Sequence, residues 1–149
     1  MNVPNFRQMY VTELQELHSV EAQLVDALPK MADVASHPEL KQAIQSHLEE
    51  TRSQRDRLEA VLCQHRAEPR EHVDQSMQAI VWEAEKWAKM VQDQDLRDAG
   101  LIDPAQRVER YEIAVYATLA TWTKQLGLDE HERTLHAILE EEKRTNERS

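Results

Sequence analysis

Glycine and proline are scarce in this chain of 149 residues, which contains two glycines and five prolines. Because both residues interrupt regular structure, their scarcity leaves room for a few long elements. Aromatic residues make up only 5% of the chain, and long β-branched runs are absent, which leaves few residues suited to strands. The composition predicts an all-α chain that is long enough for one domain with a hydrophobic core.

Cysteine and long apolar runs are also lacking. The single cysteine, Cys63, excludes an internal disulfide framework and a thiolate metal cluster. No run of about 18 apolar residues occurs, so no membrane-spanning helix is expected. The first ten residues contain no basic segment followed by an apolar one, so we expect no signal peptide and a cytoplasmic location.

Basic residues are outnumbered, with 18 Lys and Arg against 28 Asp and Glu, which gives a net charge of −10. Binding to a nucleic-acid backbone requires a basic surface, so this class of partner is excluded. The acidic excess favours solubility and attracts cations.

Apolar residues recur at alternating spacings of four and three in four segments, which is typical of helices packed in a bundle. The first segment runs from Tyr10 to Met31. Each of the four apolar seams is interrupted near its centre by a glutamate. The interrupting residues are Glu21, Glu50, Glu112 and Glu142.

These four glutamates are expected at one level of the bundle. If the first two segments form an antiparallel hairpin that turns near Ser36, Glu21 lies 15 residues before the turn and Glu50 lies 14 after it. At about 1.5 Å per residue, the two carboxylates then stand nearly level. A second hairpin turning near Leu128 brings the other two glutamates level in the same way.

Several buried carboxylates without a counter-charge are costly, and no Lys or Arg occupies these seams, so the carboxylates must protonate or share cations. Carboxylates and one imidazole suit iron, manganese or zinc. His47 precedes Glu50 by three residues and Glu109 precedes Glu112 by three, so each lies on the same helix face as its glutamate. His47 either ligates a metal or hydrogen-bonds a ligating carboxylate, and Glu109 is either a fifth carboxylate ligand or a surface residue. The predicted metal ligands are Glu21, His47, Glu50, Glu109, Glu112 and Glu142.

We predict one ferritin-like domain over residues 1–149. The segment before Pro104 is predicted to be a junction between two helices. Gly100 ends a turn, Asp103 caps the next helix and Pro104 opens it. The spacing of Gln54 and Tyr116 from the glutamates predicts that both lie near the site. His65 and His131 show no pattern that would bring them together, so we expect them to be unrelated surface or packing residues. The predicted helices cover residues 5–35, 38–66, 75–92, 104–126 and 130–147, and 75–92 is the crossover between the two hairpins.

Five segments together carry a resemblance to a known family. They are VEAQLVDALPKMA (20–32), SHLEET (46–51), LRDAGLI (96–102), RVERYEIAVYATLA (107–120) and LEEEK (139–143). The chain resembles the YciE/YciF family of bacterial ferritin-like proteins. That resemblance implies a four-helix bundle with an additional helix, a fold related to rubrerythrin, a homodimer and a role in stress responses. The six predicted ligands and Glu141 match the family's acidic and histidine pattern, while Arg110 stands where the family often has histidine.

Three functions remain open on the sequence. The first is a carboxylate protein that binds one or two iron ions, or manganese or zinc, and oxidises Fe²⁺ with O₂ or peroxide. The second is a non-catalytic stress or interaction protein whose site is structural, mononuclear or metal-free. The third is an iron-storage shell, against which the implied dimer argues. Neither a nucleic-acid nor a membrane partner is expected.

Overall fold

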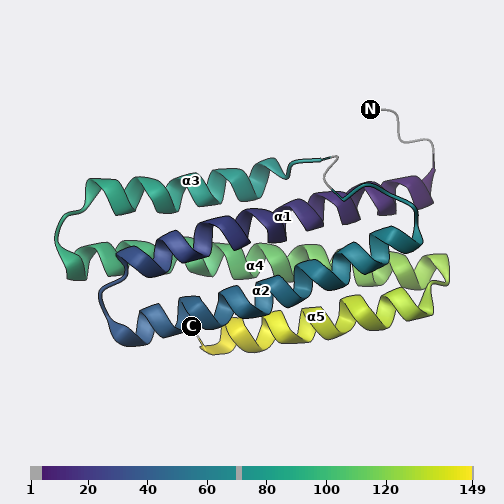
Figure 1. Ribbon diagram of the computed structural model, residues 1–149. Coiled ribbons are helices and arrows are strands. Elements are labelled where there is room, and N and C mark those ends of the chain that lie inside the picture. The colour runs from purple at the N-terminus through teal and green to yellow at the C-terminus, as the bar shows by residue number, and fades with distance from the viewer. Residues whose placement is uncertain (1–4, 70–71, 149) are drawn as a thin grey trace.

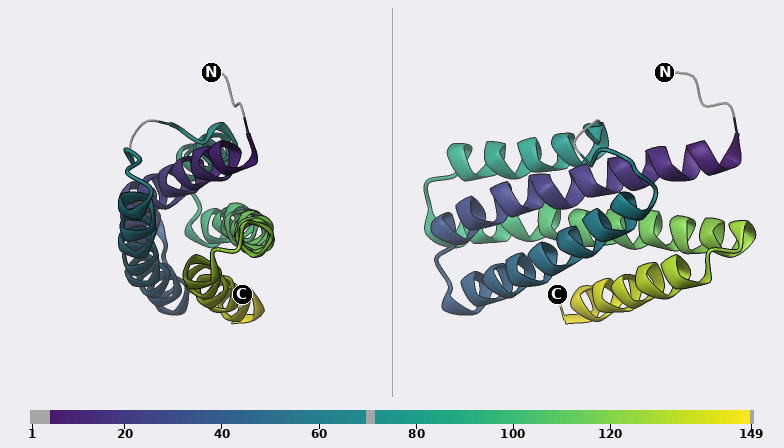
Figure 2. Two further views of the ribbon diagram at one scale, coloured as in Figure 1. Left: turned by 90° about the vertical axis from the view of Figure 1, so that its right-hand side faces the viewer. Right: turned by 45° about the vertical axis from the view of Figure 1, so that its right-hand side comes forward.

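The structure is a computed structural model that describes residues 5–69 and 72–148. This part of the chain forms five α-helices and no strand (Figure 1). Four long helices form a bundle, and a shorter one packs on the outside against two of them (Figure 2). The helices are α1 (Phe6–Val34), α2 (Pro38–Gln64), α3 (Gln75–Met90), α4 (Gln94–Leu126) and α5 (Asp129–Arg148).

The bundle consists of two antiparallel hairpins, α1 with α2 and α4 with α5, each closely packed. Helix α3 returns the chain along the bundle and lies against α1 and α4, so that α2 and α4 run in the same direction (Figure 1). A long crossover between two hairpins is the connectivity of ferritin-like bundles. The predicted all-α, ferritin-like fold with an extra crossover helix is confirmed.

The core follows the predicted seams. Leucines at the seam positions of α1 are fully buried, and each such side chain contributes roughly 1.5–3 kcal/mol by leaving water. At one end of the bundle, Phe6 packs edge-on against Trp122 with ring centroids 5.6 Å apart. Among the described helices, none combines the length and the apolar character that crossing a bilayer requires.

Helix α4 begins at Gln94, ten residues before the predicted start at 104. The Asp93 carboxylate caps the helix by accepting a hydrogen bond from the backbone N–H of Leu96 at 3.0 Å. Asp103, predicted as the cap, lies within the helix and forms an ion pair with Arg107 at 3.0 Å. The predicted start at Pro104 was wrong because Asp93, ten residues before Asp103, caps the helix.

The residues that suggested a break have other roles inside α4. Pro104 is buried within the helix. Gly100 precedes it by four residues, and a Cβ there would lie 3.4 Å from Cβ of Trp87 in α3. This is an ordinary van der Waals distance, so Gly100 lies beside α3 but its small size is not required there. Tertiary packing overrides the local tendency of both residues to end a helix.

Candidate metal centre

Three glutamates from three helices meet inside the bundle. Glu21 of α1, Glu112 of α4 and Glu142 of α5 are each 0% exposed. The charge of Glu112 acts on Glu21, and the charge of Glu142 acts on Glu112, so the three carboxyl groups influence one another. The structure thus brings together three of the glutamates that the seam pattern places at one level.

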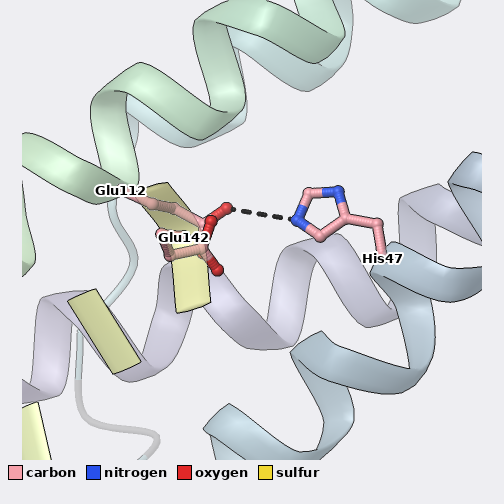
Figure 3. Close-up of side chains that lie close together, drawn as sticks. All are labelled: His47, Glu112 and Glu142. Carbon is pink, nitrogen blue, oxygen red and sulfur yellow. Dashed lines mark ion pairs between the residues drawn. The ribbon is translucent and has the colours of Figure 1, made fainter. Parts of the chain in front are cut away.

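His47 of α2 points into the same space. Its Nε2 lies 3.6 Å from a carboxylate oxygen of Glu112 (Figure 3). One ligand atom from each of His47, Glu112 and Glu142 lies within 4.8 Å of the other two. Metal–ligand bonds to imidazole and carboxylate are about 2.0–2.2 Å long, so a small inward movement would let these three side chains bind one cation.

The polar atoms at this place have no hydrogen-bond partner in the described part of the chain. They are both carboxylate oxygens of Glu21, Glu112 and Glu142, together with Nε2 of His47. Buried polar atoms are nearly always paired, because an unmade hydrogen bond to a buried group costs about 1–3 kcal/mol and more for a charge. Their concentration at one point fits a bound cation, and oxygen donors with one imidazole suit iron, manganese or zinc.

Burial raises the pKa of Glu21 and of Glu112 well above the ordinary value, and repulsion from neighbouring carboxylates adds to the effect. Burial, together with the charges of Glu21 and Glu50, raises the pKa of Glu142 to about 9. Without a cation the Glu142 carboxyl group therefore retains its proton at neutral pH, and Glu21 and Glu112 hold their protons more strongly than exposed glutamates do. A bound cation would reverse that preference, because it stabilises the carboxylate form.

Glu50 and Glu109, the two other predicted carboxylate ligands, lie at the edges of this cluster. Glu50 is half-buried, and its Oε2 accepts a hydrogen bond from the Thr145 hydroxyl of α5 at 2.8 Å. Its charge still contributes to the raised pKa of Glu142. Glu109 is buried one turn before Glu112. Ligation by either residue stays a prediction.

Glu141, which matches the family pattern, faces a different partner. Its two oxygens accept hydrogen bonds from the two Nη atoms of Arg57 at 2.6 and 2.9 Å, and one also accepts from Gln54 at 3.3 Å. Burial alone would raise the pKa of Glu141, but the hydrogen bonds from Arg57 and Gln54 outweigh it and lower that pKa. Glu141 is therefore a charged partner of Arg57 that ties α5 to α2.

The role of Arg57 is not evident from the sequence. It lies among the charged residues of α2 that resemble a solvated face. One signal was present, because Arg57 follows Glu50 by seven residues, which is about two helical turns and returns to the same face. The glutamate across the bundle could not be identified from that spacing alone.

A groove leads from the surface to the cluster. It has a volume of about 330 Å³ and lies between α1, α2 and α4. Its walls are mostly apolar, with Leu28, Ile44 and Val108 among them, and it reaches His47 and Glu109. The groove therefore brings the molecular surface as far as His47, at one edge of the buried cluster.

Two antiparallel helix pairs, a crossover helix and carboxylates that converge between the helices define a ferritin-like protein. A family model described as "Domain of unknown function (DUF892)" matches residues 5–148. The chain belongs to this family.

Relatives support the same assignment. The chain is 37% identical over 147 residues to the protein YciF of Escherichia coli strain K12, covering 98% of this chain and 89% of YciF. The expected relationship to the YciE/YciF family is therefore confirmed.

Two solved structures share the fold. The crystal structure of the E. coli stress protein YciF matches with a TM-score of 0.90 and 36% identity, covering 96% of this chain and 91% of that one. The structure of YcfI from Rhodopseudomonas palustris matches with a TM-score of 0.93 and 34% identity, covering 99% and 94%.

Proposed function

We propose that this chain is an iron-binding, ferritin-like protein that oxidises Fe²⁺ with O₂ or peroxide. Glu21, His47, Glu112 and Glu142 would form the core of its metal centre, and Glu50 and Glu109 would lie at its edges as further ligands. The observation that carries the proposal is the set of buried, unpaired carboxylate and imidazole atoms at one point in the bundle.

The side chains of this centre are suited to such a task. Bound iron supplies one-electron chemistry with O₂ or peroxide. The carboxylates provide negative charge that favours a higher positive charge on the ion, and they release their protons when the ion enters. His47 supplies the single nitrogen donor, which makes the donor set asymmetric and compatible with one or two ions. Manganese and zinc remain alternatives on donor chemistry alone.

The test begins with metal analysis of protein purified from iron-supplied cells, followed by Fe²⁺ oxidation in air. We expect at least one bound ion per chain and oxidation faster than in buffer. Glu142→Gln should remove both properties. Glu140→Gln changes a more exposed glutamate of the same helix, which pairs with Lys143 at the surface, and should retain both. Less than one ion per chain together with no oxidation above buffer would rule out the proposal.

The second candidate is a non-catalytic stress protein whose centre is structural, mononuclear or metal-free. One observation favours it: the raised pKa values allow the buried carboxyl groups to share protons at neutral pH without any ion. For this candidate, Glu142→Gln should raise thermal stability and leave the metal content unchanged. Bound zinc without Fe²⁺ oxidation would also support it.

The resemblance to the family further leads us to propose a homodimer in the cytoplasm. Large apolar side chains stand exposed on α3 and at the start of α4, among them Trp82, Met90 and Leu96. Such residues are the kind that interfaces between subunits cover. Sedimentation equilibrium tests the dimer, and a monomer at all accessible concentrations would contradict it.

A further inference from the structure

Tyr116 carries a buried hydroxyl group without a partner. The residue is 0% exposed in α4, and its hydroxyl has no hydrogen-bond partner in the described part of the chain. A buried tyrosine hydroxyl usually finds a partner, because leaving it unpaired destabilises the folded state. This hydroxyl therefore calls for a physical explanation.

The residues around Tyr116 supply an explanation for its unpaired hydroxyl. Tyr116 follows Glu112 by four residues, so the two side chains lie one above the other on the inner face of α4. Burial raises the pKa of the Tyr116 hydroxyl, and the charges of Glu21, Glu112 and Glu142 raise it further, so the hydroxyl shares the electrostatic environment of the centre. The same buried region thus holds a donor without an acceptor and carboxylate oxygens without a donor, and none of these atoms is hydrogen-bonded to another in this structure.

The chemistry of metal sites suggests how the Tyr116 hydroxyl and a glutamate of the centre interact when a metal is bound. A carboxylate that binds a metal through one oxygen is commonly held in place by a hydrogen bond to the other oxygen. Such outer partners fix the orientation of the ligand, and their loss typically weakens metal binding roughly 10- to 100-fold. Tyr116 offers one donor at the right level of the bundle.

We propose that Tyr116 is a positioning residue of the metal centre: when a divalent cation is bound, its hydroxyl donates a hydrogen bond to a glutamate oxygen of the centre. This inference rests on the proposed metal site but not on any catalytic activity. It adds a residue that supports the ligands without binding the ion.

Co²⁺ is a suitable probe, because its binding can be followed by calorimetry and by its visible spectrum without any oxidation of substrate. We expect Tyr116→Phe to lower the affinity for Co²⁺ roughly 10- to 100-fold and to leave the number of ions per chain unchanged. The bound spectrum should also change, since the ligand that loses its hydrogen bond can reorient.

Tyr10 provides a matched control. It is also 0% exposed with an unpaired hydroxyl, but it packs edge-on against His65 at another level of the bundle. Tyr10→Phe should leave Co²⁺ affinity unchanged. In the metal-free protein both substitutions should preserve or raise the melting temperature, because each removes a hydroxyl that lacks a partner.

The outcomes separate the inference from the proposed function. Tight Co²⁺ binding by the unaltered chain and equally tight binding by Tyr116→Phe would overturn the role of Tyr116 and leave the metal centre standing. Failure of the unaltered chain to bind Co²⁺, Fe²⁺ or Mn²⁺ would overturn both. A metal-free Tyr116→Phe protein much less stable than Tyr10→Phe would overturn the inference as well, because the hydroxyl would then have a structural partner.

Discussion

The carboxylate of Asp98 accepts a hydrogen bond from the backbone N–H of His37 at 2.8 Å, although the two residues belong to different hairpins. His37 is the N-terminal cap of α2, and its own side chain makes no capping bond. The other Asp98 oxygen accepts from the N–H of Ser36 at 2.8 Å. A side chain of α4 thus caps α2 and ties the α1–α2 turn to the second half of the chain.

Asp98→Ala should destabilise the protein by about 2–4 kcal/mol, because it leaves two partly buried N–H groups without an acceptor. Urea denaturation measures the loss. Asp95→Ala is the matched control: Asp95 also contacts His37, through the ring nitrogen at 3.2 Å, but its side chain is 84% exposed. The control should change stability by less than about 0.5 kcal/mol. Equal losses in both variants would contradict the assigned role of Asp98.

The sequence was sufficient for the features that depend on local periodicity. Seam spacing and helical rise are properties of each segment alone, so they predicted the long helices and the convergence of Glu21, Glu112 and Glu142. The same reasoning placed His47 on the correct face of α2. Besides the spacing and the helical rise, these predictions required only the positions of the turns near Ser36 and Leu128.

Features that depend on distant partners could not be predicted. Asp98 and His37 are 61 residues apart, and Arg57 and Glu141 are 84 apart, so no local pattern connects them. Gly100 gave a misleading signal, because it lies inside α4 beside Trp87 of α3 and not at a break between helices. Burial of Glu50 was overestimated, since its neighbourhood depends on how closely α5 approaches α2.

The metal-free protein should lose stability as the pH rises from about 7 to 9, above the range in which its histidines titrate. In the native state the pKa values of Glu21, Glu112 and Glu142 are raised above the ordinary value of 4.5. The native state therefore binds more protons than the unfolded state in this range, and each rise in pH favours unfolding. Since one pKa unit corresponds to about 1.4 kcal/mol, the loss should amount to several kcal/mol.

Thermal melts of the metal-free protein across this pH range measure the effect. Glu142→Gln should reduce the slope, because glutamine cannot ionise, whereas Glu140→Gln should not. Saturation with Mn²⁺ should abolish the decline, since the ion then stabilises the carboxylates. A flat profile for the metal-free protein would show that the buried glutamates keep ordinary pKa values.

A second pH effect should appear on the acid side. The rings of His65 and His131 lie 5.0 Å apart at 44°, with Tyr10 against His65, so the expectation that these histidines are unrelated was wrong. Burial, reinforced by the charge of Arg7, lowers the pKa of both, while Glu130 partly offsets the effect on His131. The unfolded state therefore binds more protons below about pH 6.5, and stability should fall as the pH drops through that value.

Melts between pH 5 and 7 test this acid sensitivity. His65→Gln should flatten the profile, because the variant lacks the imidazole whose pKa is lowered in the native state. His136→Gln is the control, since His136 lies exposed on α5 with its Nε2 3.8 Å from a carboxylate oxygen of Glu140. A profile that His136→Gln flattens as much as His65→Gln would assign the effect to other groups.

Arg57 should keep Glu141 out of the metal centre. Its guanidinium group engages both Glu141 oxygens, so this carboxylate is committed to a cation that the protein itself supplies. Glu141→Gln and Arg57→Met should therefore leave the number of bound ions unchanged, in contrast to Glu142→Gln. Because both side chains are partly exposed, solvent screening should limit their coupling in a double-mutant cycle to about 1 kcal/mol.

Loss of an ion in Glu141→Gln alone would show that Glu141 leaves Arg57 to bind metal. Loss in Arg57→Met alone would show that the guanidinium orders the α2–α5 side of the centre on which Glu50 stands.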